Sequence, residues 1–327
     1  MTRSRSGGGI VTYHPKDAPE AGPPPQPDAQ AAAVDASIVI RTYNEGKWLG
    51  DALKAVAAQN PEPYSYEVVI VDSGSTDDTL KIAEAHGCRI THIKKSEFTF
   101  GRSLNMGCEA AIGRFLVFIS GHCIPSGERW LHNLVKPLDE GVCAYTYGRQ
   151  MGKPGITKFS EEQLFRKYFP DCSHIPQDDF FCNNANSAIL TSVWKSHPFD
   201  ETVTGLEDMA LAKQLVADGM KIGYVADAPV IHIHEESWSK VKTRYEREAV
   251  ALQDIMPEVH VGFGDFVRYT LAGIMHDWGE ALDQRVFWKE AGNIVMFRFN
   301  QYWGSYQGNN NHRKLSQRRK DRYFYPR

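Results

Sequence analysis

The sequence has few cysteines, and they form no framework. Six thiols are scattered along the chain without a Cys-x-x-Cys spacing: Cys88, Cys108, Cys123, Cys143, Cys172 and Cys182. Disulfide scaffolds and zinc knuckles need closely spaced cysteines, so this pattern predicts free thiols in a reducing compartment. Cys172, His174 and Cys182 are not predicted to bind zinc, because their spacing is poor and no fourth ligand is evident.

A long apolar run is also missing. No uninterrupted apolar stretch approaches the roughly 18 residues that a membrane-spanning helix needs, and the first residues contain no apolar signal-peptide core. We therefore expect a cytoplasmic protein.

A strong charge of either sign is absent. The 37 basic and 40 acidic residues give a formal net charge of -3, which provides no overall attraction to nucleic acid, so we predict no nucleic-acid partner. With 42% hydrophobic and 24% charged residues, the composition is that of a globular protein.

Four segments differ in composition. Residues 1–35 are rich in Gly, Pro and Ala and predict a disordered tail. Residues 36–235 alternate strand and helix patterns, and residues 236–311 predict an extension of amphipathic helices, which would cover a sheet face or lie on a membrane surface. Residues 312–327 predict a basic tail, which is either solvated or attracted to anionic lipids at the inner face of the cell membrane.

An unbroken apolar run at residues 115–119 ends in Ser120, Gly121 and His122. Such a run, bounded by Gly and Pro, predicts a central strand buried on both faces. Residues 37–41 and 67–71 show strand patterns that are each followed by a polar turn and helical spacing. This alternation predicts an α/β fold with a mostly parallel sheet flanked by helices, in which ligands bind beyond the carboxyl ends of the strands.

Less regular sequence follows the strand pattern near residues 143–148. Residues 151–179 contain Gly, Pro and one short helical pattern, and we interpret them as a candidate acceptor-side flap. Strand patterns resume at residues 183–190, 221–225 and 230–232.

Polar turns follow the strands at residues 37–41 and 67–71. They are Thr42-Tyr-Asn-Glu45 and Asp72-Ser-Gly-Ser-Thr-Asp-Asp78. Hydroxyl and carboxylate side chains at a strand end, just before a helix, can hold a nucleoside by hydrogen bonds. The alternative is an ordinary helix cap by Ser75 or Thr76. The nucleoside interpretation gains weight because both turns would lie at the same edge of the sheet.

Three segments, in order and spacing, are similar to the landmark segments of family 2 glycosyltransferases: Ser37-Ile-Val-Ile-Arg-Thr-Tyr-Asn-Glu45, Val69-Ile-Val-Asp-Ser-Gly-Ser-Thr-Asp77 and Gly205-Leu-Glu-Asp-Met-Ala-Leu211. The resemblance covers residues 36 to about 250 and is nearest to the bacterial rhamnosyltransferase-like branch. It implies a GT-A fold, a nucleotide-diphosphate sugar donor and inversion at the anomeric carbon. It also implies a glycan or lipid-linked acceptor in surface polysaccharide assembly.

The resemblance further implies which residues bind the donor. The nucleoside pocket would be lined by Thr42, Tyr43, Glu45, Asp72 and Ser73. Further donor contacts would come from Ser75, Arg102, Ser120 and Gly121. Ser73 stands where many relatives have a second Asp that contacts the base, so the nucleobase is left open.

The chain departs from the family at the end of strand 115–120. Relatives usually have Asp-x-Asp there, binding the ribose and a divalent cation, whereas this chain has Ser120-Gly121-His122. His122 takes the place of the metal-binding Asp. His232 and His234 follow the last core strand, where related enzymes place a metal-binding His, and strand alternation points both to one face.

Three imidazoles would suit Mn²⁺ better than Mg²⁺, so the expected cofactor is a divalent metal, Mn²⁺ before Mg²⁺. Two other roles stay open for these histidines. They could donate hydrogen bonds directly to phosphate oxygens, or they could be packed in the core.

Asp208 and Glu207 match the Glu-Asp motif of the family, and the resemblance implies that Asp208 is the catalytic base. Inverting transfer needs a carboxylate that removes the acceptor hydroxyl proton. The alternative is that both residues only complement the dipole of the first helical turn.

The remaining candidates concern the substrates. Without a metal, the leaving-group charge would fall to Arg102, Lys242, Arg244 or Arg247. Trp130, Asn183 and Asn184 are candidates for contact with donor or acceptor sugar, with structural packing as the alternative.

Two other functions are possible alternatives for this sequence. A sugar-nucleotide pyrophosphorylase needs a Gly-rich, basic phosphate loop after the first strand, and none is present. A non-catalytic sugar-nucleotide-binding or scaffold protein is suggested by the loss of Asp-x-Asp, but the retained Glu207-Asp208 pair argues against it.

Overall fold

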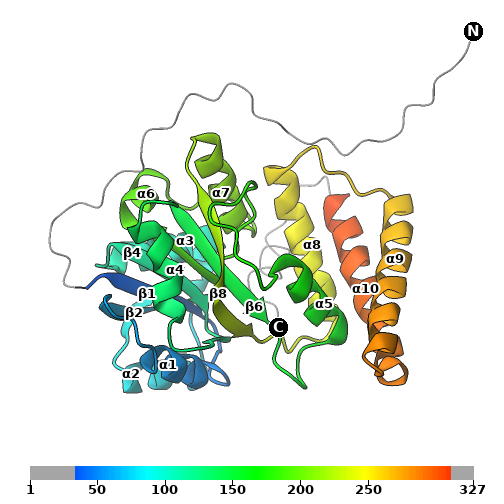
Figure 1. The fold of residues 1–327 in the computed structure, drawn as a ribbon, viewed down its shortest axis with the longest axis horizontal. Helices are drawn as coiled ribbons and strands as arrows, with labels where there is room; N and C mark the ends of the chain where they lie inside the picture. The colour runs from blue at the N-terminus through cyan, green and yellow to red at the C-terminus, as the bar shows by residue number, and fades with distance from the viewer. Residues whose placement is uncertain (1–33, 311–327) are drawn as a thin grey trace, which may run out of the picture.

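The computed structural model describes residues 34–310. The predicted tails at residues 1–35 and 312–327 lie outside the described residues, except for residues 34 and 35. The described part forms an α/β body with three long helices beside it (Figure 1).

An eight-stranded sheet forms the centre of the body, in the order β3-β2-β1-β4-β7-β6-β8-β5. The strands are β1 (Ala36–Thr42), β2 (Tyr66–Asp72), β3 (Arg89–His92), β4 (Phe115–Ser120), β5 (Cys123–Pro125), β6 (Tyr145–Met151), β7 (Asn186–Leu190) and β8 (Ile222–His232). Successive residues of β1 and β4 are buried on both faces of the sheet. This double burial explains their nearly continuous apolar sequences.

The sheet is parallel in four of its seven pairings. β3, β2, β1 and β4 are parallel neighbours, and so are β6 and β8. β7 is antiparallel to both β4 and β6, and β5 is antiparallel to β8. The predicted parallel units are therefore confirmed in the first half of the sheet, while its second half is mixed.

The helices are α1 (Leu49–Ala57), α2 (Thr79–Ala85), α3 (Phe100–Ala110), α4 (Trp130–Asp139), α5 (Phe159–Tyr168), α6 (Thr191–Ser196), α7 (Glu207–Ala217), α8 (Trp238–Ile255), α9 (Phe263–Asp283) and α10 (Phe287–Asn309), with a 3₁₀ turn at Lys95–Glu97. In α1 the buried Leu49, Leu53 and Val56 follow the helical spacing that the sequence shows. Thr99 caps α3 by accepting a hydrogen bond from the backbone N–H of Arg102.

Three elements differ from the sequence prediction. The strands expected at residues 221–225 and 230–232 are one continuous strand, β8. β5 and α6 were not predicted, because three and six residues are too few to show a period.

The three C-terminal helices lie where amphipathic spacing predicts helices. α10 packs against both α8 and α9 (Figure 1). α10 approaches α8 closely at two glycines one turn apart. A Cβ at Gly304 would lie 2.4 Å from the carbonyl oxygen of Lys242, and one at Gly308 would lie 2.2 Å from that of Glu246. None of the described helices is both long and apolar enough to cross a membrane.

We expect Gly308→Ala to destabilise the protein by about 1–3 kcal/mol, because the added methyl group pushes α10 away from α8. Gly292→Ala on the same helix is the matched control. Its added Cβ meets no atom within 4 Å, and Ala in place of a helical Gly stabilises by roughly 0.5–1 kcal/mol. Urea unfolding measures both changes, and equal stabilities would contradict the close approach of the helices.

Candidate active site

The polar turns after β1, β2 and β4 meet at one edge of the sheet. The parallel register places Thr42 opposite Asp72 and Arg41 opposite Ser120. Because these strands share a direction, the turns that follow them lie together, as predicted from the sequence.

Asp72 organises the turn after β2. Its buried carboxylate accepts hydrogen bonds from the backbone N–H groups of Gly74 (2.9 Å) and Ser75 (3.0 Å) and from the hydroxyls of Thr42 (3.0 Å) and Ser75 (2.5 Å). The buried hydroxyl of Ser73 donates to the carbonyl oxygen of Thr42. Thr42, Asp72, Ser73 and Ser75 therefore fix the shape of the turn from behind the cavity wall.

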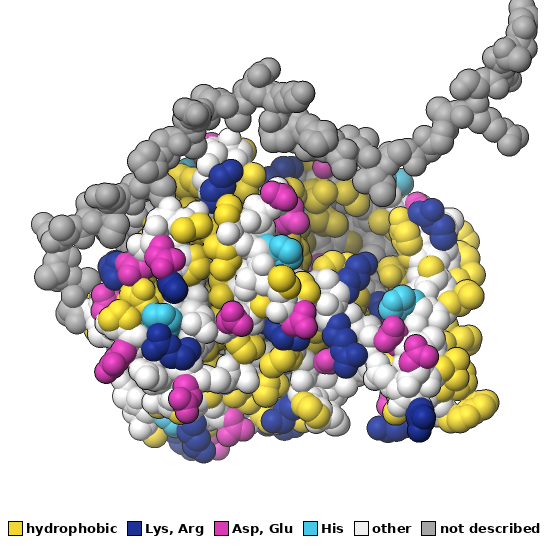
Figure 2. All heavy atoms as spheres, in the orientation of Figure 1, with side chains coloured by type: hydrophobic (Ala, Val, Ile, Leu, Met, Phe, Trp, Pro, Cys, Tyr) yellow, Lys and Arg dark blue, Asp and Glu magenta, His cyan; other side chains and the backbone are white. Residues whose placement is uncertain are grey.

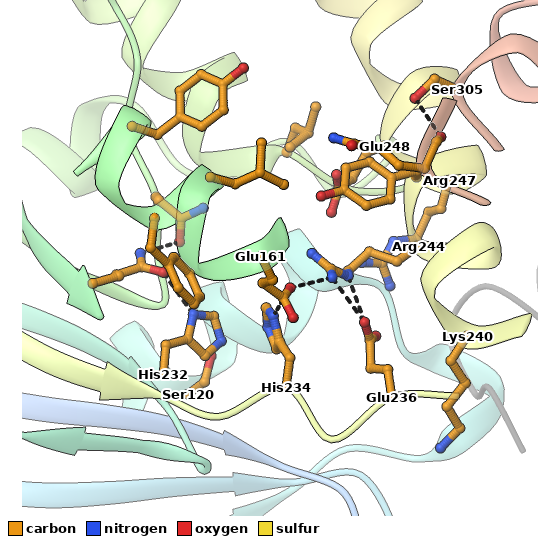
Figure 3. Close-up of a pocket in the computed structure, with 18 of the residues that line it drawn as sticks. Ser120, Glu161, His232, His234, Glu236, Lys240, Arg244, Arg247, Glu248 and Ser305 are labelled. Carbon is orange, nitrogen blue, oxygen red and sulfur yellow. Dashed lines mark hydrogen bonds and ion pairs between the residues drawn. The ribbon is translucent and has the colours of Figure 1, made fainter. Parts of the chain in front are cut away.

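A cavity of about 1440 Å³ opens beyond this edge and reaches the C-terminal helices. Its wall combines the turns after β1 and β4, α5, the end of β8 and one side of α8, α9 and α10, and Figure 3 shows part of it. The predicted site residues that line it are Tyr43, Glu45, Ser120, His122, Asn183, His232, His234, Arg244 and Arg247.

Three histidines meet in this wall. Cys123 of β5 pairs with His232 of β8, and the backbone N–H of Ile233 donates to the carbonyl oxygen of His122, which brings the two loops together. The ring centroids of His232 and His234 are 4.0 Å apart, and His122 lies 5.2 Å and 5.9 Å from them. One nitrogen of each ring lies within 4.8 Å of the others, a spacing suited to a shared ligand.

The Nδ1 atom of each ring lies within hydrogen-bond distance of a side-chain oxygen. The three pairs are His122 with Glu45 (3.0 Å), His232 with Gln150 (2.7 Å) and His234 with Glu161 (2.7 Å). Such an acceptor keeps the proton on Nδ1 and leaves the lone pair of Nε2 for a ligand. Metal-binding histidines are usually held in this way.

The rings differ in their tendency to be protonated. Burial, together with neighbouring basic side chains, lowers the pKa of His232 well below its usual value. Burial also disfavours the charged form of His122, but Glu45 and Glu236 outweigh it and raise the pKa of that ring. The lowered pKa holds His232 in its neutral form.

Glu161 connects the histidine cluster to α8. Its carboxylate accepts hydrogen bonds from His234 and from Arg244 (2.5 Å), and Arg244 also pairs with Glu236 at 2.9 Å (Figure 3). Burial alone would raise the pKa of Glu161, but His234 and Arg244 lower it to about 2. The second carboxylate oxygen of Glu161 has no hydrogen-bond partner among the described residues, which leaves a buried anionic oxygen beside the cavity.

The second acidic feature is the start of α7. Leu206, just before it, has a left-handed backbone with φ 56° and ψ 31°, a conformation that is strained for Leu and concentrates at functional sites. Asp208 accepts hydrogen bonds from the backbone N–H groups of Asn184 (2.7 Å) and Met209 (2.8 Å). Glu207 pairs with Arg41 at 3.0 Å.

Asp208 lies just behind the cavity wall. It is 6% exposed, and Leu206 and Met209 on either side of the pair both line the cavity. Burial, reinforced by the charge of Glu207, raises the pKa of Asp208 to about 7, although its backbone hydrogen bonds act in the opposite direction. A carboxyl group with this pKa can accept and release a proton near neutral pH.

Residues 37–193, a little under half of the chain, match the model of the family described as glycosyl transferase family 2. The chain is also 27% identical over 222 residues to the O-antigen chain rhamnosyltransferase WbaN of Salmonella anatum, an alignment that covers 64% of this chain and 69% of that protein. The matched segment is therefore a glycosyltransferase family 2 domain. RfbN of Salmonella typhimurium, another O-antigen chain rhamnosyltransferase, is 24% identical with the same coverage of both chains.

Solved glycosyltransferases have a similar fold. The mannosyltransferase PcManGT from Pyrobaculum calidifontis, in complex with GDP-Man and Mn²⁺, matches with a TM-score of 0.59 at 14% identity, over 90% of this chain and 91% of that one. Residues 1–349 of S. aureus TarS match with a TM-score of 0.50 at 16% identity, over 85% and 93% of the two chains. The predicted GT-A fold is confirmed.

Trp130 and Arg102, both predicted to contact a substrate, lie away from the cavity. Trp130 is only 1% exposed, and its indole N–H donates to the side-chain oxygen of Asn186 (2.9 Å). The structure therefore supports its packing alternative rather than contact with a sugar. Arg102 is outside the cavity wall as well and lies 3.9 Å from Glu97.

The two adjacent asparagines have different surroundings. Asn183 lines the cavity, and its side-chain oxygen accepts a hydrogen bond from Gln150 (2.9 Å). Asn184 is buried, and its side-chain oxygen accepts from the hydroxyl groups of Tyr145 and Ser187. The backbone N–H of Asn184, and not its side chain, contacts Asp208. Asn184 therefore supports Asp208, and its buried side chain is not placed for the predicted sugar contact.

Sequence reasoning missed three residues of this site. Gln150 is near the end of β6, where the rule on strand ends could have found it. Arg41 lies inside the first family segment, but nothing in the sequence indicates that its side chain pairs with Glu207. Glu161 had no sequence signal, because it falls in the irregular stretch that was interpreted as a flap.

We expect Glu161→Gln to destabilise the protein at neutral pH by about 3 kcal/mol, because it removes a charge whose pKa is lowered from 4.5 to about 2. Since the folded pKa lies below the unfolded one, this stabilisation is complete above pH 4.5 and is lost as the pH falls towards 2. Urea unfolding from pH 7 down to about pH 3 should show the difference from wild type shrinking.

Glu162→Gln, at the next position of α5, is the control for this experiment. Glu162 forms a partly exposed pair with Arg166, so we expect a change within about 0.5 kcal/mol at every pH. A difference between Glu161→Gln and wild type that does not vary with pH would contradict the pairing of Glu161.

Proposed function

We propose that this glycosyltransferase is an inverting enzyme that moves a sugar from a nucleotide-diphosphate donor to a glycan or lipid-linked acceptor in surface polysaccharide assembly. The names of WbaN and RfbN as O-antigen chain rhamnosyltransferases support this acceptor class. TarS, named a poly(ribitol-phosphate) beta-N-acetylglucosaminyltransferase, supports it as well. The observation that carries the proposal is the position of Asp208 just behind the cavity wall, where two backbone N–H groups orient it and its pKa is about 7.

In this proposal Asp208 is the general base. Its carboxylate takes the proton of the acceptor hydroxyl while that oxygen forms a bond to the anomeric carbon of the donor. The bond from that carbon to the diphosphate breaks, and its electron pair leaves with the nucleoside diphosphate. Attack from the face opposite the leaving group inverts the anomeric configuration. Glu207 assists by raising the proton affinity of Asp208.

The three histidines fit a divalent metal ion. The fit rests on their donor set, in which each Nδ1 is held by an oxygen and one nitrogen of each ring lies within 4.8 Å of the others. Imidazole ligands suit Mn²⁺ and other transition ions better than Mg²⁺. When bound, such an ion supplies positive charge that stabilises the diphosphate leaving group.

The basic residues of α8 have a secondary role in this proposal. Arg244 lines the cavity, but its charge is already shared by Glu161 and Glu236. It therefore positions the wall of the cavity more than it neutralises a diphosphate. Arg247 lines the same cavity and is a second basic candidate for phosphate contact.

We expect Asp208→Asn to lower kcat by about 10²–10⁴-fold, because an amide cannot accept the proton. Wild-type turnover should fall as the pH drops below about 7, since the base must be ionised. Donor turnover measured from pH 5.5 to 9 tests both expectations. Asp218→Asn, at the other end of α7 and paired with His197, is the control and should keep wild-type turnover.

The same variants distinguish the proposal from a non-catalytic scaffold. A catalyst gives wild-type turnover, while Asp208→Asn keeps donor binding and loses turnover. A scaffold binds nucleotide sugars equally in both proteins and turns over none. Full activity of Asp208→Asn would show that another group is the base.

For the metal, we expect Mn²⁺ to bind wild type and to bind His122→Ala at least about 100-fold more weakly, because one of three ligands is lost. Calorimetric titration with Mn²⁺ alone, then with a panel of nucleoside diphosphates with Mn²⁺ or EDTA, measures this without any turnover. His132→Ala is the control, since His132 contacts the carbonyl oxygen of Glu62 away from the cavity. Nucleotide binding that is the same in EDTA and in Mn²⁺ would favour direct phosphate contact by the histidines.

The proposal also includes peripheral binding of the protein to anionic lipids at the inner face of the cell membrane. This contact would bring a lipid-linked acceptor to the cavity.

A further inference from the structure

Exposed apolar side chains are concentrated on one part of the molecule. Of the fourteen large hydrophobic side chains that are exposed in residues 34–310, nine lie on α9 or α10. The other five are scattered over the α/β body and α5. Single exposed apolar residues need no explanation, whereas a contiguous set of them marks an interaction surface.

Five of the nine form a stripe along the outer side of α9. All five lie within one arc of the helical wheel that is about 120° wide. The first four are spaced four residues apart, and the fifth, seven residues further on, falls in the same arc. They are Phe263, Val267, Leu271, Met275 and Leu282. Together with Trp288, which is 94% exposed at the start of α10, they form what we call the α9–α10 face. Figure 2 shows hydrophobic side chains along this outer edge of the molecule.

Aromatic side chains of α9 pack against aromatic side chains of α10. At one end the ring of Phe266 lies 5.9 Å from that of Phe299, which is itself exposed. At the other end the ring of Phe287 lies 5.9 Å from Trp278 and 5.1 Å from Trp288. Aromatic packing therefore joins α9 to α10 near both ends of the stripe.

Charged side chains of α9 avoid the stripe. On the helical wheel the acidic Asp265, Glu280 and Asp283 fall on the side opposite to it, and Arg268 lies at its border. The cavity-lining Tyr269, Gly273 and His276 also fall on the side opposite to the stripe. α9 thus separates the cavity from the exposed face.

The end of α10 lies beside the start of α9. The backbone N–H of Val261 donates to the side-chain oxygen of Asn309 (2.7 Å), and the rings of Phe263 and Tyr306 are 5.9 Å apart. The chain therefore leaves α10 next to one end of the α9–α10 face. The segment that follows carries seven basic residues against the single acidic Asp321: Arg313, Lys314, Arg318, Arg319, Lys320, Arg322 and Arg327.

We propose that the α9–α10 face binds the surface of an anionic phospholipid bilayer, with the basic segment after α10 as a second attachment. Apolar insertion and basic attraction are each weak alone and together give stable peripheral binding. An anionic bilayer accounts for both the stripe and the basic segment, whereas a second copy of this chain accounts for the stripe alone. This inference rests on the membrane contact within the proposed function, but it does not depend on sugar transfer.

Flotation of the full chain with vesicles tests the proposal. Wild type should bind vesicles of equal parts phosphatidylglycerol and phosphatidylcholine and should bind pure phosphatidylcholine vesicles much more weakly. The double variant Leu271→Glu with Met275→Glu should lose at least about tenfold in binding, because it puts charge into the apolar stripe. Both residues are more than half exposed, at 57% and 71%, so the fold should be retained.

Three further variants sharpen this test. Val142→Glu changes an exposed apolar residue of the α/β body and should bind vesicles as wild type does. Trp288→Ala removes an apolar anchor without adding charge and should weaken binding to both vesicle types. Replacing Arg318, Arg319 and Lys320 together by Gln should weaken binding to the anionic vesicles by about ten- to hundredfold, and much less to the neutral ones.

Three results would overturn the proposal. The first is a wild type that binds neither kind of vesicle, and the second is a double variant that binds as well as wild type. The third is a wild-type dimer in sedimentation that the double variant abolishes, with no vesicle binding, which would make a second copy the occupant. Donor turnover of the double variant without vesicles should equal that of wild type, so a failed membrane test and a failed transferase proposal remain distinguishable.

Discussion

A buried negative charge must be compensated, and at Glu161 this one requirement joins three parts of the fold. The residue is on α5, while its partners His234 and Arg244 come from the end of β8 and from α8, 73 and 83 positions later. An uncompensated carboxylate at this depth would be strongly destabilising. α5 therefore cannot leave the cavity wall without breaking both contacts, so the stretch interpreted as a flap contains a fixed part of the site.

Burial acts on both functional groups of the cavity through the same physical effect. It disfavours the charged form, so it lowers the pKa of His232 and raises that of Asp208. His232 is thereby kept neutral, with a lone pair free to bind a ligand, while Asp208 comes closer to exchanging a proton near neutral pH. The cavity needs no unusual side chains for this, only depth and well-chosen neighbours.

Much of this arrangement follows from local sequence patterns. The turns after β1, β2 and β4 were predicted to meet because parallel strands share an edge, and the alternation along β8 was enough to place His232 and His234 together. The direction of β7 was not predictable, since an apolar run carries no information on strand orientation. Glu161 and Gln150 escaped notice because they act on the histidines across the fold. Trp130 was ambiguous, since an aromatic residue at a helix start packs in a core as readily as it stacks on a sugar.

The contact between Glu45 and His122 has a consequence for how this sequence could change. The Glu45 carboxylate lies 3.0 Å from His122, and a Cβ at Gly121 would come within 2.8 Å of the Glu45 side chain. An Asp in place of His122 would face Glu45 as a like charge, and a larger residue in place of Gly121 would displace it. An acidic pair at positions 120 and 122 would therefore also require a change at position 45 while Gly121 is kept, so single substitutions along that path meet an energetic barrier.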